Sequence, residues 1–142
     1  MPIHIRRLAE VDIAVVHRLG LKEPAFAFQE VQCFWTEDQL RAWFASQDDI
    51  CLGAYDDGAL IGFALTVVHI PTGKATFENL LVLPEARGQN VGDLLIGAML
   101  AILRERRIFY VCLLTPNASL SGYFERFGFR HEGAFAWHAR AP

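Results

Sequence analysis

The stretch LLVLPEARGQNVGDLLIGAML, Leu80 to Leu100, decides the fold because its character changes along its length. It opens as an apolar run typical of a strand, breaks at Pro84, and becomes apolar again at helical spacing. A strand that leads directly into a helix leaves backbone N–H groups without acceptors. Together with the helix dipole, these groups form a binding place for an anion. The polar turn between the two elements is therefore a candidate anion site.

The residues of this turn fit that interpretation. Gly88 and Gly92 have no side chains to keep an anion away from the backbone, and Asn90 tolerates a positive φ better than most residues. Arg87 could add a charge-assisted contact. The turn lacks the Lys-Ser or Lys-Thr of a P-loop and the spacing of a dinucleotide fold. On these residues alone, an ordinary strand-to-helix loop remains the alternative.

The composition indicates one domain that spans residues 1–142. The chain is 53% hydrophobic, which is enough for one core. Its net charge is −3 and its arginines are dispersed, which argues against a nucleic-acid partner. Its three cysteines lack metal-ligand spacing, and its longest apolar helix candidate is too short for a bilayer. We expect a soluble cytoplasmic protein with no signal peptide, metal or membrane partner.

Hydrophobic periodicity and turn signals predict an α/β chain, of mixed α+β character. The expected strands cover residues 3–8, 50–55, 59–70, 75–83 and 108–115, and β-like residues recur over 128–140. The expected helices cover residues 9–21, 37–46, 91–107 and 117–127. These elements predict a single central, mixed, mostly antiparallel sheet of six to seven strands, flanked by about four helices.

The run ENLLVLPEARGQNVGDLL, residues 78–95, resembles the central motif of the GNAT acyltransferase superfamily. In that family a strand leads through a Pro-Glu-x-Arg-Gly turn into a helix, and the loop binds the pyrophosphate of acetyl-CoA. YFERFGF, residues 123–129, resembles the family's FYEKxGF, and DDGALIGFA, residues 56–64, resembles its hairpin. The resemblance covers nearly the whole chain. It implies the GNAT fold and an acetyl-CoA-dependent N-acetyltransferase that needs no metal and works by direct attack in a ternary complex.

The resemblance also implies which residues bind the cofactor. The strand before the turn would pair with the pantetheine arm, and the turn would surround the pyrophosphate. The implied cofactor-binding residues are Leu80, Leu81, Val82, Arg87, Gly88, Gln89, Asn90, Val91, Gly92, Asp93, Asn117 and Phe124. Two positions depart from the family pattern: Asn90 replaces its first motif glycine, and Asp93 brings a carboxylate near the phosphates. An Asp93 side chain that points to solvent would avoid the repulsion.

Glu78 is the candidate general base, at a position where many members of the family carry a catalytic Glu. The alternative is an exposed Glu on the outer face of its strand. Many members also carry a Tyr that protonates the leaving thiolate, but that position is Phe124 here. Tyr123 is a candidate acid one residue earlier, where a helix has turned by about 100°. Water is the other option, because a thiol with a pKa of about 8.5 leaves easily.

The segment between the first strand and Ile50 would form a wall of the acceptor site in the family. Its aromatic and acidic residues are Phe26, Phe28, Phe34, Trp35, Trp43, Glu23, Glu30, Glu37 and Asp38. They suit a cation with an apolar part, and core packing is the alternative. FWTEDQL also resembles the PWS region of ribosomal-protein alanine N-acetyltransferases, although Cys112 replaces a Glu used there. The expected acceptor is a small-molecule amine or a peptide N-terminus, and a homodimer is among the expected partners.

Two other functions remain open at this point. The first is a non-catalytic acyl-CoA-binding or sensing module, which Phe124 in place of the family Tyr would allow. The second is an anion-binding structural domain without affinity for coenzyme A.

Overall fold

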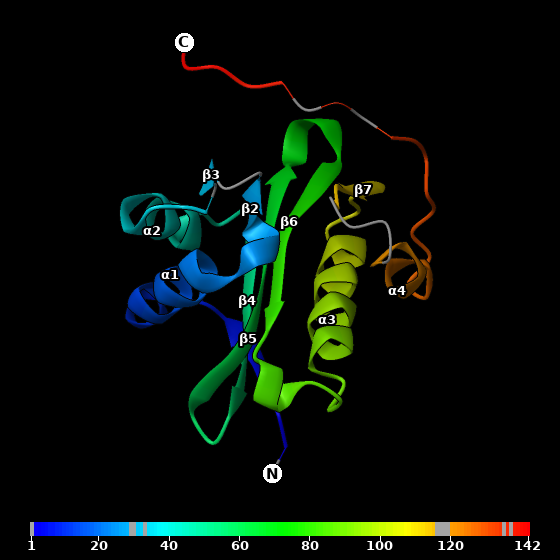
Figure 1. Cartoon of the computed structure of the whole chain (residues 1–142). Helices are drawn as coiled ribbons and strands as arrows, with labels where there is room; N and C mark the ends of the chain where they lie inside the picture. The colour runs from blue at the N-terminus through cyan, green and yellow to red at the C-terminus, as the bar shows by residue number, and fades with distance from the viewer. Residues whose placement is uncertain (1, 29–30, 33, 116–119, 135, 137) are drawn as a thin grey trace.

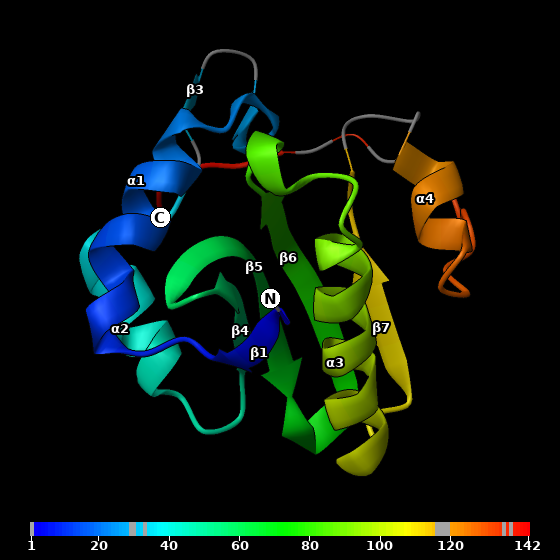
Figure 2. The same ribbon diagram turned by 90° about the horizontal axis from the view of Figure 1, so that it is seen from below.

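A five-stranded sheet forms the centre of the computed structural model and has helices on both faces (Figure 1). The structure describes residues 2–28, 31–32, 34–115, 120–134, 136 and 138–142. Helices α1 and α2 cover one face of the sheet and α3 covers the other, as the perpendicular view shows (Figure 2).

The main sheet has the order β1-β4-β5-β6-β7. Its strands are β1 His4–Arg7, β4 Ile50–Asp56, β5 Ala59–His69, β6 Lys74–Val82 and β7 Tyr110–Leu113. The pairings are antiparallel from β1 to β6, and β6 and β7 are parallel. A separate two-stranded sheet contains β2 Ala27–Phe28 and β3 Val31–Gln32. The helices are α1 Ile13–Lys22, α2 Glu37–Ala45, α3 Val91–Glu105 and α4 Ser121–Glu125.

Over the described residues, this architecture confirms the α/β class, the mixed sheet and the four helices, but the prediction of six to seven strands in the central sheet is wrong. The expected last strand over residues 128–140 accounts for the difference. Its described residues from Arg130 onward are exposed and form no strand. Alternating side chains give a segment the pattern of a strand, but a strand also needs the backbone groups of a neighbour. The described part of this segment makes no such ladder.

The two faces of the sheet follow from the alternation of side chains along each strand. In β4, Ile50, Leu52 and Ala54 belong to the cluster that packs against α3. Cys51 and Tyr55, between and after them, belong to the cluster that contains α1 and α2. Both sets are buried, so β4 reads as a continuous apolar run rather than an alternating one.

Helix α2 begins with the capping box that its sequence predicted. The hydroxyl of Thr36 accepts a hydrogen bond from the Gln39 amide at 3.2 Å, and the Gln39 side chain accepts one from the Thr36 amide at 2.9 Å. Two backbone donors at the helix start are thus satisfied. The cap fixes where the helix begins, so that Leu40, Trp43 and Phe44 face the core.

Thr36→Ala is expected to lower the free energy of unfolding by about 1 kcal/mol, because it removes the acceptor for the Gln39 amide. Urea denaturation followed by circular dichroism measures this change. Thr36→Ser is the matched control, since it keeps the hydroxyl and is expected to stay within a few tenths of a kcal/mol of the parent. Equal losses in the two variants would contradict the role of the cap.

Candidate active site

Strands β6 and β7 separate in the middle of β6. Their pairing runs from Lys74 opposite Tyr110 to Phe77 opposite Leu113 and then stops. Beyond this point β6 continues to Val82 and, among the described residues, pairs only with β5. Within the part of the chain that the structure describes, the backbone groups of residues 78–82 that face away from β5 therefore have no strand partner. This edge of β6 is the one that the family resemblance assigns to the pantetheine arm.

Glu78 lies at a β-bulge in β6. Leu65 of β5 is opposite Asn79 and the next residue, Thr66, is opposite Phe77, so Glu78 is an extra residue in its strand. The extra residue shifts the alternation that follows it. Before the bulge, Phe77 packs into the cluster beneath α3, whereas Leu81 after the bulge packs into the opposite cluster.

A cleft of about 630 Å³ lies where β6 and β7 separate. One wall consists of the end of β6, the following turn and the start of α3, and the other consists of the end of β7 with α4. Glu23 and Phe26, from the segment after α1, also line it. The predicted site residues that line the cleft are Glu78, Leu80, Leu81, Val82, Arg87, Gly88, Asn90, Val91, Gly92, Asp93, Tyr123 and Phe124.

Two of the predicted site residues are not among the described residues that line the cleft. Gln89 is exposed in the turn and is absent from the lining, and Asn117 lies outside the described residues. Sequence reasoning also missed several residues that line the cleft, among them the polar residues Asn79 and Arg126. Asn79 follows Glu78 directly, whereas Arg126 carries no motif signal apart from its place within YFERFGF.

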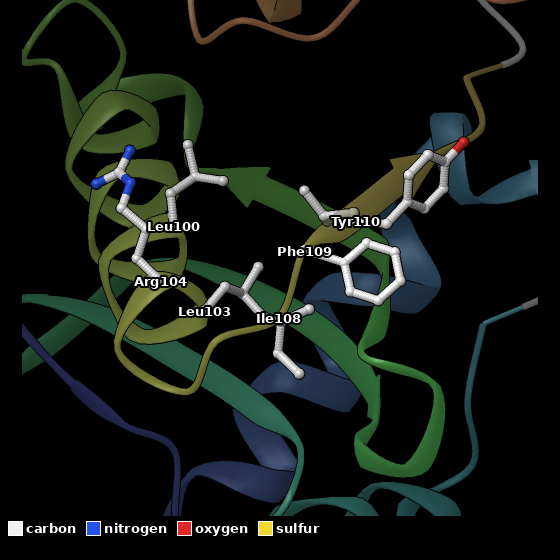
Figure 3. A pocket seen from close by; sticks show the side chains of 7 residues that line it. Leu100, Leu103, Arg104, Ile108, Phe109 and Tyr110 are labelled. Atoms are coloured by element: carbon white, nitrogen blue, oxygen red, sulfur yellow. The ribbon is translucent and has the colours of Figure 1, made fainter.

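A second hollow lies between α3 and β7, together with the residues that lead into β7 (Figure 3). It holds only about 100 Å³, and its lining includes Leu103, Ile108 and Phe109. A nucleotide-sized ligand needs a site of several hundred Å³. The cleft at the end of β6 is therefore the candidate site.

The turn before α3 contains two residues in the left-handed region, one of which is Asn90, for which the sequence indicated a positive φ. Asn90 has φ 60° and ψ 26°, and Gly88 has φ 84°. The Leu94 amide donates to the Asn90 carbonyl at 3.0 Å and makes the first regular helical hydrogen bond. The amides of Val91, Gly92 and Asp93 precede it and have no acceptor within the helix. The three residues that carry these amides line the cleft, at the positive end of the helix dipole.

Asp93 is paired with two side chains rather than pointing freely into solvent. Its carboxylate accepts a hydrogen bond from the Tyr123 hydroxyl at 3.1 Å and from Arg126 Nη2 at 2.8 Å. The ion pair compensates the negative charge that the sequence placed beside an anion site. The same contacts join the start of α3 to α4 across the cleft.

Gly92 leaves room for the Tyr123 hydroxyl group. A Cβ atom at Gly92 would lie 2.5 Å from the Tyr123 hydroxyl oxygen. At Gly88, in contrast, a Cβ would meet nothing within 4 Å, so its positive φ is the reason for glycine. The two glycines of the turn thus serve different needs.

Glu78 and Asn79 lie side by side at the bulge. Although the Glu78 side chain stays exposed at the cleft, its partial desolvation raises the pKa of its carboxyl group above the ordinary value. The Asn79 side chain accepts a hydrogen bond from Trp35 Nε1 at 2.8 Å. Trp35 in turn packs edge-on against Trp43, with ring centroids 5.1 Å apart. Asn79 is thereby anchored to the aromatic segment before α2.

Tyr123 and Phe124 lie on α4 and face the cleft in different ways. Burial and the neighbouring Asp93 carboxylate raise the pKa of Tyr123 to about 12. Phe124 packs edge-on against Phe77, with ring centroids 6.3 Å apart. A Tyr hydroxyl that donates a hydrogen bond to a carboxylate is a weaker acid than a free phenol.

The aromatic and acidic residues of the expected acceptor wall divide between cleft and core. Phe34 and Trp43 are buried in the core cluster of α1 and α2. Glu37 lies 3.8 Å from the His17 side chain, and Asp38 pairs with Arg41 at 2.9 Å. The members of the set that line the cleft are Glu23 and Phe26. Nothing is described for the side chain of Phe28 or for Glu30.

Among the described residues, no group of three or more His, Cys, Asp and Glu could hold a metal ion. Within the same ranges, no helix is both long enough and apolar enough to cross a membrane.

Residues 21–129 match the Acetyltransferase (GNAT) family. The chain therefore belongs to this family, and the resemblance seen in its turn and hairpin motifs is confirmed. The fold agrees: a PaiA N-acetyltransferase from Thermoplasma acidophilum in complex with coenzyme A superposes with a TM-score of 0.83 at 20% identity. That superposition covers 95% of this chain and 94% of the other.

Among curated proteins, the chain is similar to mycothiol acetyltransferases. It is 35% identical to that of Rhodococcus jostii over 87% of this chain and 44% of the relative. It is 33% identical to that of Salinispora arenicola over 87% and 43%. The chain thus spans less than half the length of these relatives. The ribosomal-protein-S18-alanine N-acetyltransferase of Escherichia coli shares the fold, with a TM-score of 0.74 at 22% identity over 93% and 80% of the two chains.

Alanine substitutions at two glycines of α3 should differ in their effect on stability. Gly97 has open space around its Cβ position, so Gly97→Ala is expected to raise the free energy of unfolding by about 0.5–1 kcal/mol. Gly92→Ala must displace the Tyr123 hydroxyl and is expected to be about 1–3 kcal/mol less stable than Gly97→Ala. Urea titration of both variants measures the difference. Adding Tyr123→Phe should recover part of the loss at position 92, and two equally stabilising alanines would refute the steric contact.

Proposed function

We propose that the chain is an acetyl-CoA-dependent N-acetyltransferase that acts on a primary amine of a small molecule or of a protein N-terminus. One observation carries the proposal: the start of α3, the unpaired edge of β6 and Glu78 all open into the same cleft. Family membership supports acetyl transfer, and the fold is shared with a protein solved in complex with coenzyme A.

The residues of the cleft fit the two chemical parts of coenzyme A. The amides of Val91, Gly92 and Asp93 and the guanidinium of Arg87 would hold the pyrophosphate. Arg87 is itself oriented by a hydrogen bond from its Nε to the Val82 carbonyl at 3.4 Å. The backbone of residues 80–82 pairs with no described strand on the side away from β5, and it would pair there with the amides of the pantetheine arm, as a strand pairs with a sheet edge.

Acetyl-CoA supplies an activated acetyl thioester when it is bound. The amine nitrogen of the acceptor forms a bond to the acetyl carbon, and the carbon–sulfur bond breaks. Glu78 accepts the proton that the amine loses, directly or through water. The free N–H groups of the β6 edge would stabilise the negative charge that develops on the acetyl oxygen. The thiolate leaves and takes its proton from water or from Tyr123.

The acceptor end of the cleft favours a cationic amine. Glu23 and Glu78 both line the cleft, and Phe26 contributes an aromatic face. The arginines of the lining, Arg87 and Arg126, come from the turn and from the end of α4. Carboxylates beside an aromatic ring suit an ammonium group with an apolar part. This wall supports a small-molecule amine or a protein N-terminus equally.

A non-catalytic acyl-CoA-binding module is the second candidate function. Phe124 in place of the family Tyr, and the engagement of the Tyr123 hydroxyl by Asp93, are the observations that favour it. This alternative predicts coenzyme A binding without turnover of any amine.

Calorimetric titration with acetyl-CoA tests the cofactor assignment. The parent protein is expected to bind, and Gly92→Glu is expected to lose binding, because it places a carboxylate among the amides at the start of α3. Gly97→Glu is the matched control, since Gly97 lies in the same helix outside the cleft and should keep the parent affinity. A parent protein that does not bind would remove the proposed function.

The pH dependence of turnover tests the base. Glu78 must be ionised to accept a proton, and its raised pKa moves the acidic limb of kcat/KM above the ordinary Glu value of about 4.3. Activity should therefore rise with pH through the pKa of Glu78. Glu78→Gln is expected to abolish this limb and to lower kcat by about 10²–10⁴-fold. Glu85→Gln, at an exposed carboxylate outside the cleft lining, is the control and should leave the profile unchanged.

A further inference from the structure

The ion pair between Asp93 and Arg126 lies at the phosphate end of the proposed coenzyme A cleft, and both residues line it. A lone carboxylate in the first turn of α3 would repel a phosphate and oppose the helix N-terminus that attracts it. Here both carboxylate oxygens are occupied, Oδ2 by Arg126 and Oδ1 by Tyr123. The carboxylate therefore presents a paired charge to the cleft.

Arg126 is held in place but keeps capacity to bind. Its guanidinium lies 5.4 Å from the centroid of the Tyr123 ring and 5.6 Å from that of the Phe127 ring. The bond to Asp93 uses Nη2, and a guanidinium carries further N–H donors in one plane. The Arg126 side chain is 58% exposed, whereas Asp93 is 30% exposed. The more accessible partner at the cleft is thus the cation.

We propose that Arg126 binds a phosphate group of coenzyme A, and that Asp93 is a positioning residue that holds the Arg126 guanidinium at the cleft. The inference rests on the proposed function. Arg126 comes from the end of α4, on the wall opposite the turn that carries Arg87. Cationic side chains from both walls would then meet the phosphates, together with the amides of α3.

The test is calorimetric titration of coenzyme A against the parent protein, Arg126→Gln and Arg130→Gln. Arg126→Gln is expected to weaken binding by about tenfold, the loss of one charge-assisted contact. Arg130 is the matched control, because it is 85% exposed, pairs with Glu132 at 3.3 Å and lies outside the cleft lining. Arg130→Gln is expected to bind as the parent does, so that a general loss of positive charge is separated from the loss of this contact.

Asp93→Asn separates positioning from repulsion. If Asp93 holds Arg126 in place, Asp93→Asn weakens coenzyme A binding in the parent background and causes no further loss when combined with Arg126→Gln. If Asp93 only repels the phosphates, Asp93→Asn tightens binding in both backgrounds, which overturns its positioning role. The thermal midpoint of each variant shows whether a change in affinity arises from a change in folding.

Titration with 3′-dephospho-coenzyme A distinguishes which phosphate Arg126 meets. A tenfold loss that persists with this ligand assigns the contact to the pyrophosphate, and a loss that disappears assigns it to the 3′-phosphate. Arg126→Gln with the parent affinity for coenzyme A would overturn the inference while leaving the proposed function intact. A parent protein that binds no coenzyme A would overturn both.

Discussion

The separation of β6 from β7 after Phe77 is the constraint on which the candidate site depends. A buried strand normally satisfies its backbone groups on both sides, and groups left without partners cost free energy. Here β6 loses its neighbour on one side while β5 continues to pair with it as far as Val82. The free edge opens into a cleft rather than into the core, so water or a ligand can satisfy it. The same separation brings the start of α3 and the whole of α4 to opposite walls.

Features that depend on neighbouring residues could be predicted from the sequence. The capping box at Thr36 needs only a residue three positions later, and the positive φ of Asn90 follows from the demands of a tight turn. The hairpin between β4 and β5 is also local, with Asp57 and Gly58 at φ 49° and 81°. Local signals of this kind, taken together, predicted the order of the helices and the antiparallel pairing of the consecutive strands β4, β5 and β6.

Features that depend on pairing between distant segments could not be predicted in this way. The bulge at Glu78 is a mismatch of register between two strands. Neither strand contains a glycine or proline at that point, so the sequence carries no local signal for the bulge. The contact between Asp93 and Arg126 joins α3 to the end of α4, so the sequence alone left Asp93 as an unexplained carboxylate. The strand expected over residues 128–140 shows the reverse error, because a suitable pattern without a pairing partner makes no strand.

Helix α4 contains five residues, fewer than a helix needs to persist alone in water. Its order therefore depends on the ring contacts of Tyr123 and Phe124 and on the carboxylate of Asp93. A short element held by a few side-chain contacts is expected to open locally at a lower free energy than a packed sheet. The two walls of the cleft are therefore expected to differ in local stability. Amide hydrogen exchange along the chain would register that asymmetry as a steep fall in protection between β6 and α4.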